Sequence, residues 1–389
     1  MRGMQGFMGR IDRLGALLGG LGALACLCLP FVLFKANRIL PGEPRALLDV
    51  LSPGAVWALY ATLAGTAAVM LFVERPVLRL IVALLGIAAV CLAVGAAADA
   101  LTPDGNRVVR VSPGGAFWAL LVLLGLLATD ALTRLRLRPV ARVGCLALFL
   151  AAVVAALATG YFDDLSIMRE YRVNAATFGR EVQRHLWLAF GSLFAAVAVG
   201  LPLGLLCHRE PRLRAGVLGA LNFVQTVPSI ALFGLLMAPL AALAVAVPWL
   251  GEHGVSGIGA APAVVALFLY ALLPIVANTV VGLSQVSPAT VDAATGMGFT
   301  AGQRLRQVEL PLALPTILTG IRIVLVQNIG LVTIAALIGG GGLGAFVFQG
   351  IGQTAIDLVL LGAIPTVVLA FASAVLLDAC IAWTRRGLR

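Results

Sequence analysis

The sequence predicts an all-α polytopic membrane protein with about ten transmembrane helices. Of the 389 residues, 61% are hydrophobic and 11% are charged, and the mean hydropathy is +1.05. Soluble domains carry about 25% charged residues, so a soluble fold of this length could not bury so much apolar surface. The apolar residues form long continuous runs instead of alternating with polar residues, which favours helices over a β-barrel.

Ten apolar segments approach the length of about 20 residues that a helix needs to cross a membrane. The segments are approximately 11–34, 54–73, 77–98, 114–133, 139–160, 184–207, 215–247, 260–284, 316–338 and 355–383. The segment 215–247 is too long for a straight span, and Pro228 and Pro239 indicate that it is bent or broken. We count it as one crossing.

The distribution of positive charge predicts the orientation of these spans. With the N-terminus in the cytoplasm, 18 of the 27 Lys and Arg residues fall on the cytoplasmic side and 9 fall outside. This bias follows the positive-inside rule and predicts that both termini are cytoplasmic. A polar stretch, predicted as an outside loop over 161–182, then divides the chain into residues 1–182 and 183–389, each with five spans.

The sequence shows no motif for ATP binding, metal binding or catalysis. The single lysine, Lys35, follows an apolar run and lies in no phosphate-binding loop, so the chain is not expected to bind ATP in that way. The six cysteines lie in or beside apolar runs and resemble small core residues. We therefore expect no catalytic residue, metal or bound cofactor. Acidic residues lie near the ends of the spans, which weakens the case for an ion-coupled secondary carrier.

One polar stretch, over residues 285–315, interrupts the apolar C-terminal half on the predicted cytoplasmic side. Ser287 and Pro288 are a favoured start for a short helix, predicted over about 288–296. Thr300 and Gln303 match a capping box that starts a second short helix, predicted to end at Pro311. A plain surface loop between two spans is one interpretation, but two capped helices are more than such a loop needs.

The stretch resembles the EAA loop of permease subunits of ABC importers. That pattern is Glu-Ala-Ala, three residues, Gly, nine residues, Ile, one residue, Leu-Pro. This chain keeps every spacing, with Asp for Glu and Val for Ile, in the residues Asp292, Ala293, Ala294, Gly298, Val308, Leu310 and Pro311. The resemblance implies that these residues dock onto a separate ATPase, and we call residues 285–315 the coupling loop. It also implies a type I permease core over residues 183–389.

Three further segments, 225–236, 271–283 and 335–351, are similar to permeases that import glycine betaine, choline or carnitine. The extra N-terminal spans are similar to a longer subgroup of those permeases. The resemblance implies two ATPase copies that bind ATP-Mg, a second permease subunit (the same chain or a paralogue), an extracytoplasmic binding protein and a location in a bacterial inner membrane. No nucleic-acid partner is expected, and an ion-coupled carrier or a non-transporting assembly scaffold are the alternative functions.

Other polar or glycine-rich positions are candidates for the solute path. The candidate path residues are Gln225, Thr226, Pro228, Gln327 and Asn328. Broken helices and polar residues inside spans can line a path, but they can equally form contacts between helices. The candidate outer mouth is a glycine-rich loop containing Gly339, Gly340, Gly341, Gly342 and Gly344. A plain turn is the alternative there, and nucleotide binding is excluded because no strand precedes the glycines.

Overall fold

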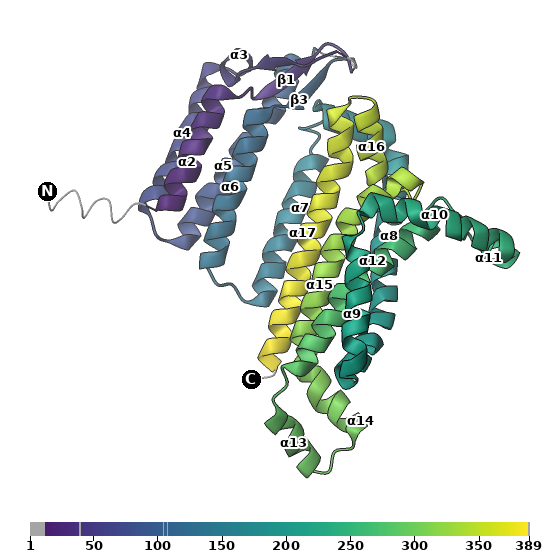
Figure 1. The fold of residues 1–389 in the computed structure, drawn as a ribbon. Coiled ribbons are helices and arrows are strands. Elements are labelled where there is room, and N and C mark those ends of the chain that lie inside the picture. Colours follow the sequence, from purple (N-terminus) through teal and green to yellow (C-terminus); the bar gives the residue numbers. More distant parts are fainter. Residues whose placement is uncertain (1–11, 39, 104, 107, 388–389) are drawn as a thin grey trace. The chain divides into compact units, whose positions relative to one another are not determined.

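The computed structural model describes residues 12–387, apart from residues 39, 104 and 107 (Figure 1). The start of the first expected span, at residue 11, and both chain termini lie outside the described residues. The chain forms two compact units. The N-terminal unit comprises Met1–Arg138 and Leu148–Val173, and the C-terminal unit comprises Pro139–Ala147 and Asn174–Arg389.

Helices make up nearly all of the described structure. The first helices are α2 (Arg13–Cys28), α3 (Leu47–Val50), α4 (Pro53–Phe72), α5 (Pro76–Leu101), α6 (Gly115–Arg134), α7 (Pro139–Ala158) and α8 (Ser166–Arg209). They are followed by α9 (Pro211–Thr226), α10 (Ser229–Ala246), α11 (Pro248–Glu252), α12 (Ala260–Ser284), α13 (Pro288–Gly296), α14 (Ala301–Arg304), the π-helix η1 (Leu305–Glu309), α15 (Leu310–Ala335), the 3-10 helix η2 (Ala336–Ile338), α16 (Gly344–Gly352) and α17 (Ile356–Gly387).

Nine helices in the described part of the chain are long and apolar enough to cross a membrane. The remaining expected span, 11–34, is the shorter apolar helix α2, which has 16 residues. At the usual rise per residue this helix is only about 24 Å long. The chain leaves the helix after Cys28 and enters strand β1, so the last residues of the expected span are not helical.

The segment 215–247 is broken near Pro228, as its proline content predicted. Helix α9 ends at Thr226 and α10 begins at Ser229, with Pro228 as its N-cap residue. Because α10 is an apolar helix of 18 residues and α9 is less apolar, the segment supplies one helix of crossing length. Pro239 lies inside α10 without ending it.

The prediction of a loop over 161–182 is wrong, because most of this stretch is helical. Helix α8 begins at Ser166 and continues without a break to Arg209, a length of 44 residues. The polar residues of this stretch therefore do not indicate a loop; most of them belong to helix α8. An amphipathic helical extension of a span carries polar residues on its exposed face, and this pattern interrupts the apolar run just as a loop does.

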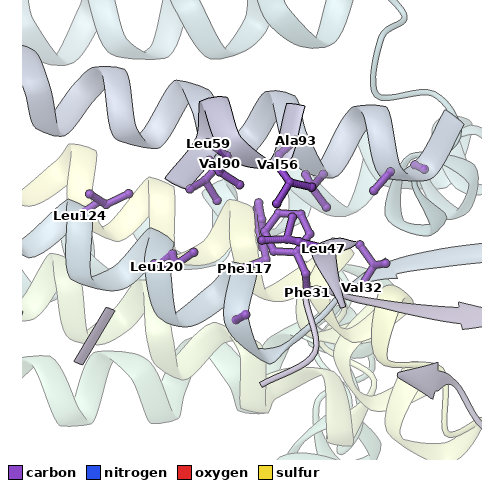
Figure 2. Close-up of a cluster of buried hydrophobic side chains, with 14 of the residues drawn as sticks. Phe31, Val32, Leu47, Val56, Leu59, Val90, Ala93, Phe117, Leu120 and Leu124 are labelled. Carbon is purple, nitrogen blue, oxygen red and sulfur yellow. The ribbon is translucent and has the colours of Figure 1, made fainter. Parts of the chain in front are cut away.

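In the N-terminal unit, a small antiparallel sheet packs beside the helices. Its strands are β1 (Val32–Lys35), β2 (Glu43–Arg45) and β3 (Arg110–Pro113), in the order β2-β1-β3. Strands of three or four residues leave little periodic signal in a sequence, so they were not expected. The hydrophobic core of this unit includes Phe31 and Phe117, whose rings meet edge to face at 6.3 Å between centroids (Figure 2).

Four charged side chains join three helices of the N-terminal unit. The Arg79 guanidinium is only 3% exposed and lies 2.8 Å from the Asp12 carboxylate and 3.4 Å from that of Asp130. Arg134 contacts both carboxylates at 2.8 Å. Arg79 also donates to the carbonyls of Val73 and Met70. A buried charge is tolerated when it is paired and hydrogen-bonded in this way.

In the C-terminal unit, α15 is the central helix. It packs against α12 on one side and α17 on another, and its side chains Val324, Ile329 and Val332 are fully buried. Helices α13 and α14 lie at one end of this unit, and α16 lies at the opposite end (Figure 1). The central helix therefore connects the coupling loop with the glycine-rich loop.

Candidate functional site

The first half of the coupling loop is a short helix closed by a glycine. As predicted, α13 covers Pro288–Gly296 and follows Ser287. Gly298 has a φ angle of 86°, in the left-handed region. Its N–H donates to the Thr295 carbonyl at 3.0 Å, and the Phe299 N–H donates to the Ala294 carbonyl at 3.1 Å. This is the Schellman arrangement, which favours glycine at that position.

The structure separates the predicted docking residues by exposure. Asp292, Ala293 and Gly298 are exposed, and Met297 beside them is 70% exposed. Ala294 is only 1% exposed and faces inward, so only one of the two adjacent alanines offers a small surface to a partner. The docking role of these residues stays a prediction.

The second half of the coupling loop begins as the sequence predicted but does not end as predicted. The Thr300 N–H donates to Gln303 Oε1 at 2.9 Å, and the Gln303 N–H donates to Thr300 Oγ1 at 3.3 Å, so the capping box forms. The second helix was expected to stop at Pro311. Instead, the chain passes through the π-helix η1 into α15 without leaving a helical path.

The π-helix explains how the chain continues past Pro311. Leu310 donates its N–H to the Leu305 carbonyl, five residues back. Pro311 then lies in the first turn of α15, the part of a helix where proline is tolerated. Val308, Leu310 and Pro311 are half-buried along this path. Residues 301–338 thus form one helical run.

Arg304 braces the two halves of the coupling loop. Its Nε lies 2.7 Å from Glu309 Oε1, and its Nη1 donates to Thr295 Oγ1 at 3.1 Å. The Glu309 side chain is only 12% exposed, so this ion pair is partly shielded from water. Sequence reasoning missed both residues, because a spacing of five along a chain with a π-helix matches no usual helical pair.

Gln225 satisfies a carbonyl that a proline leaves free. Pro274 lies inside α12 and has no N–H, so the carbonyl of Tyr270, four residues earlier, lacks its usual helical partner. Gln225 Nε2 donates to that carbonyl at 2.8 Å. The Tyr270 hydroxyl in turn donates to the carbonyl of Val227, between α9 and α10. These two hydrogen bonds join α12 to the junction of α9 and α10, and a path-lining role for Gln225 stays a prediction.

The other candidate path residues differ in exposure. Thr226 and Pro228 are exposed, and Gln327 is half-buried. Asn328 is fully buried in α15, where its Nδ2 donates to Ser192 Oγ of α8 at 2.9 Å. Within the described part of the chain, Asn328 Oδ1 has no hydrogen-bond partner. The structure therefore places Asn328 in a contact between helices, and a path-lining role for all four residues stays a prediction.

The glycine-rich loop (residues 339–344) is a tightly packed turn. Gly339, Gly341 and Gly342 have φ angles of 78°, 75° and 85°. A Cβ atom at Gly344 would lie 2.0 Å from the Thr333 carbonyl oxygen, so no larger residue fits there without movement. The loop is packed against α8 at Glu181, Arg184 and His185. Sequence reasoning did not single out these residues, because no local pattern pairs them with glycines some 160 residues later.

Two family models match separate parts of this chain. The family of binding-protein-dependent transport system inner membrane components matches residues 197–389, and the N-terminal domain of the ABC transporter permease YehY matches residues 12–168. The solved MetNI methionine ABC transporter has a TM-score of 0.47 and 24% identity, covering 53% of this chain and 95% of that chain.

Curated relatives match about half of this chain and most of their own length. The osmoprotectant import permease protein OsmW of Salmonella typhimurium is 45% identical, over 51% of this chain and 86% of the relative. The choline transport system permease protein OpuBD of Bacillus subtilis is 39% identical, over 57% and 90%. The chain therefore belongs to the binding-protein-dependent inner membrane components: it is a multi-pass permease subunit of an ABC importer, whose ATP is used by a partner ATPase and whose solute is delivered by a binding protein.

Proposed function

We propose that this chain moves a small osmoprotectant, glycine betaine or a related quaternary amine, into the cytoplasm by alternating access. The observation that carries this proposal is the coupling loop. It presents Asp292, Ala293 and Gly298 on an exposed surface and continues as one helical run into the central helix α15. A partner that moves the loop would therefore move the core of the permease.

The substrate class comes from the relatives. Their names refer to osmoprotectant import, choline transport and glycine betaine/carnitine/choline transport. These solutes share a compact quaternary ammonium group, which aromatic cages bind well. We expect the binding protein to supply most of the selection among them.

The coupling loop is proposed to face the cytoplasm and to dock onto one of two ATPase copies. Asp292, Ala293, Ala294, Gly298, Val308, Leu310 and Pro311 would form or shape the docking surface. The glycine-rich loop would then lie at the outer mouth of the path, and both termini would be cytoplasmic. A second permease subunit, either this chain again or a paralogue, would complete the path.

The N-terminal region is proposed as an accessory part, separate from the transport core. The proposed division, 1–182 and 183–389, is supported by the two compact units, whose boundary within α8 lies between Val173 and Asn174. It is also supported by the two family models, which match residues 12–168 and 197–389. Each part has its own hydrophobic core.

An ion-coupled carrier would need an acidic side chain free to bind its ion. In the C-terminal unit, Asp378 of α17 is paired with Arg322 of α15. A carboxylate neutralised by arginine is a poor ion site, because binding a cation would require breaking the pair. This pairing makes Asp378 a poor candidate for the ion site of a carrier.

The test is uptake of labelled glycine betaine into proteoliposomes that contain the whole complex and ATP. Gly298→Val is compared with the wild type. Valine resists the left-handed region, so the loop after α13 must change its path. The matched control is Gly296→Ala, an exposed helical position of the same loop where an added Cβ meets no described atom within 4 Å. We expect wild-type and Gly296→Ala complexes to transport, and Gly298→Val to lose most uptake.

The possible results separate the competing functions. Transport of another solute with the same loop dependence would keep the ABC permease and change the substrate. Uptake that follows an ion gradient without ATP, and that tolerates Gly298→Val, would reject the proposal in favour of a carrier. No uptake of any quaternary amine by an assembled wild-type complex would favour a scaffold.

A further inference from the structure

Three side chains of α8 hold the backbone of the glycine-rich loop. Glu181, Arg184 and His185 have the spacing that places side chains on one face of a helix. The Gly342 N–H donates to Glu181 Oε2 at 2.6 Å, and Arg184 Nε donates to the Gly340 carbonyl at 3.0 Å. The Leu343 N–H donates to His185 Nδ1 at 3.2 Å. We call these three residues the α8 clamp.

The α8 clamp supplies hydrogen-bond partners for backbone groups of the glycine-rich loop. Glycines 339–342 have no side chains with which to cap their own backbone groups, and buried backbone groups require partners. Some backbone groups of the loop find partners nearby in the chain; the Gly340 N–H, for example, donates to the Ala335 carbonyl. The Gly342 and Leu343 N–H groups instead depend on α8. The loop conformation is therefore set by a neighbouring helix.

His185 also joins the loop to α15. Its Nδ1 accepts from Leu343, so its other nitrogen, Nε2, carries the proton and donates to the Ile329 carbonyl at 3.0 Å. The side chain is fully buried. Two turns further along α8, Ser192 accepts the hydrogen bond from Asn328. A row of polar contacts thus runs along the α8–α15 interface from the glycine-rich loop to Asn328.

We propose that Glu181, Arg184 and His185 are positioning residues that make the glycine-rich loop move with α8 when α15 is moved from the coupling loop. The inference rests on the proposed function, because it assigns these residues to the step that links the ATPase to the far end of the path. The helical run 301–338 transmits displacement along its axis, and the clamp ties its far end to α8. Without the clamp, ATP hydrolysis would continue but would not reorient the mouth of the path.

The first experiment measures glycine betaine taken up per ATP hydrolysed in proteoliposomes containing the whole complex. Glu181→Ala removes the acceptor for Gly342, whereas Glu181→Gln keeps an acceptor oxygen at that place. Gln183→Ala is the matched control on an exposed face of the same helix. Loss of a hydrogen bond to a charged group predicts that Glu181→Ala lowers the uptake per ATP by about tenfold. We expect Glu181→Gln to restore most of it and Gln183→Ala to match the wild type.

A second measurement does not depend on transport. Amide hydrogen exchange of the assembled permease should become faster at Gly342 and Leu343 in Glu181→Ala, and at Leu343 in His185→Asn, but not in Gln183→Ala. Unchanged exchange in both variants would overturn the proposal. Equal losses of uptake and ATP hydrolysis, with the ratio unchanged, would also overturn it and leave the clamp a purely structural contact. Failure of the wild-type complex to transport would instead count against the proposed function, while the exchange result still tests the clamp.

Discussion

The two loops at opposite ends of α15 acquire their shapes in different ways. The coupling loop is stabilised mostly by its own residues: a Schellman turn at Gly298, a capping box at Thr300 and the Arg304 brace. The glycine-rich loop is stabilised mostly by residues distant in the sequence, with Glu181 more than 150 residues from its partner Gly342. The exposed coupling loop thus folds locally, whereas the buried glycine-rich loop depends on its neighbours.

This difference matters for function. A loop that keeps its own shape can be presented to an ATPase before the complex assembles, and binding then costs less ordering of the chain. A loop held by another helix instead changes when that helix changes. We therefore expect substitutions in the glycine-rich loop to affect the fold of the permease, and substitutions in the coupling loop to affect mainly its docking.

The largest effect should come from Gly344→Ala. The added Cβ would lie 2.0 Å from the Thr333 carbonyl oxygen, which belongs to the rigid backbone of α15. Overpacking of this kind costs about 3 kcal/mol, and we expect a clear fall in the melting temperature of the detergent-purified permease. The matched control is Gly330→Ala, an exposed position of α15 where the Cβ meets no described atom within 4 Å. Equal melting temperatures for the two variants would contradict the tight packing of this loop.

A smaller effect is expected for Arg304→Gln in the coupling loop. The substitution removes a partly shielded ion pair with Glu309 and the contact with Thr295, which together contribute about 1 kcal/mol. We expect the ATPase to bind the permease about fivefold more weakly, with a smaller fall in permease melting temperature than in Gly344→Ala. The measurement is a titration of the purified ATPase onto permease in nanodiscs.

The control for that prediction is Arg306→Gln, which removes the same charge from an exposed position of η1. If both variants weaken ATPase binding equally, then net charge and not the brace determines docking. Such a result would contradict the idea that the Arg304 brace shapes the docking surface.

The features that the sequence predicted correctly are those encoded by neighbouring residues. The apolar runs predicted the membrane helices, Ser287 with Pro288 predicted the start of α13, and Thr300 with Gln303 predicted the capping box. Each signal depends on residues a few positions apart. Pro228 likewise predicted the break between α9 and α10, because a proline affects the helix that contains it.

The features that sequence reasoning missed depend on residues brought together by folding. The α8 clamp joins residues near 181 to residues near 342, and no local pattern indicates that pairing. Pro311 was expected to end a helix, but a π-helix before it removed the conflict. The hydrogen bond from Gln225 to the Tyr270 carbonyl that Pro274 leaves free also joins distant residues, and the path-lining role of Gln225 stays a prediction.

The smallest effect, and the sharpest contrast between the loops, is expected for Thr300→Ala. The variant loses the side-chain cap of α14, which usually costs about 1 kcal/mol. Because Arg304 and the Schellman turn remain, amide exchange should become faster only near residues 300–303, and uptake should stay close to that of the wild type. Thr300→Ser keeps the hydroxyl and should behave like the wild type. If Thr300→Ala instead lowered uptake as strongly as Glu181→Ala, the coupling loop would be as dependent on a single contact as the glycine-rich loop, and the contrast between self-supported and helix-held loops would fail.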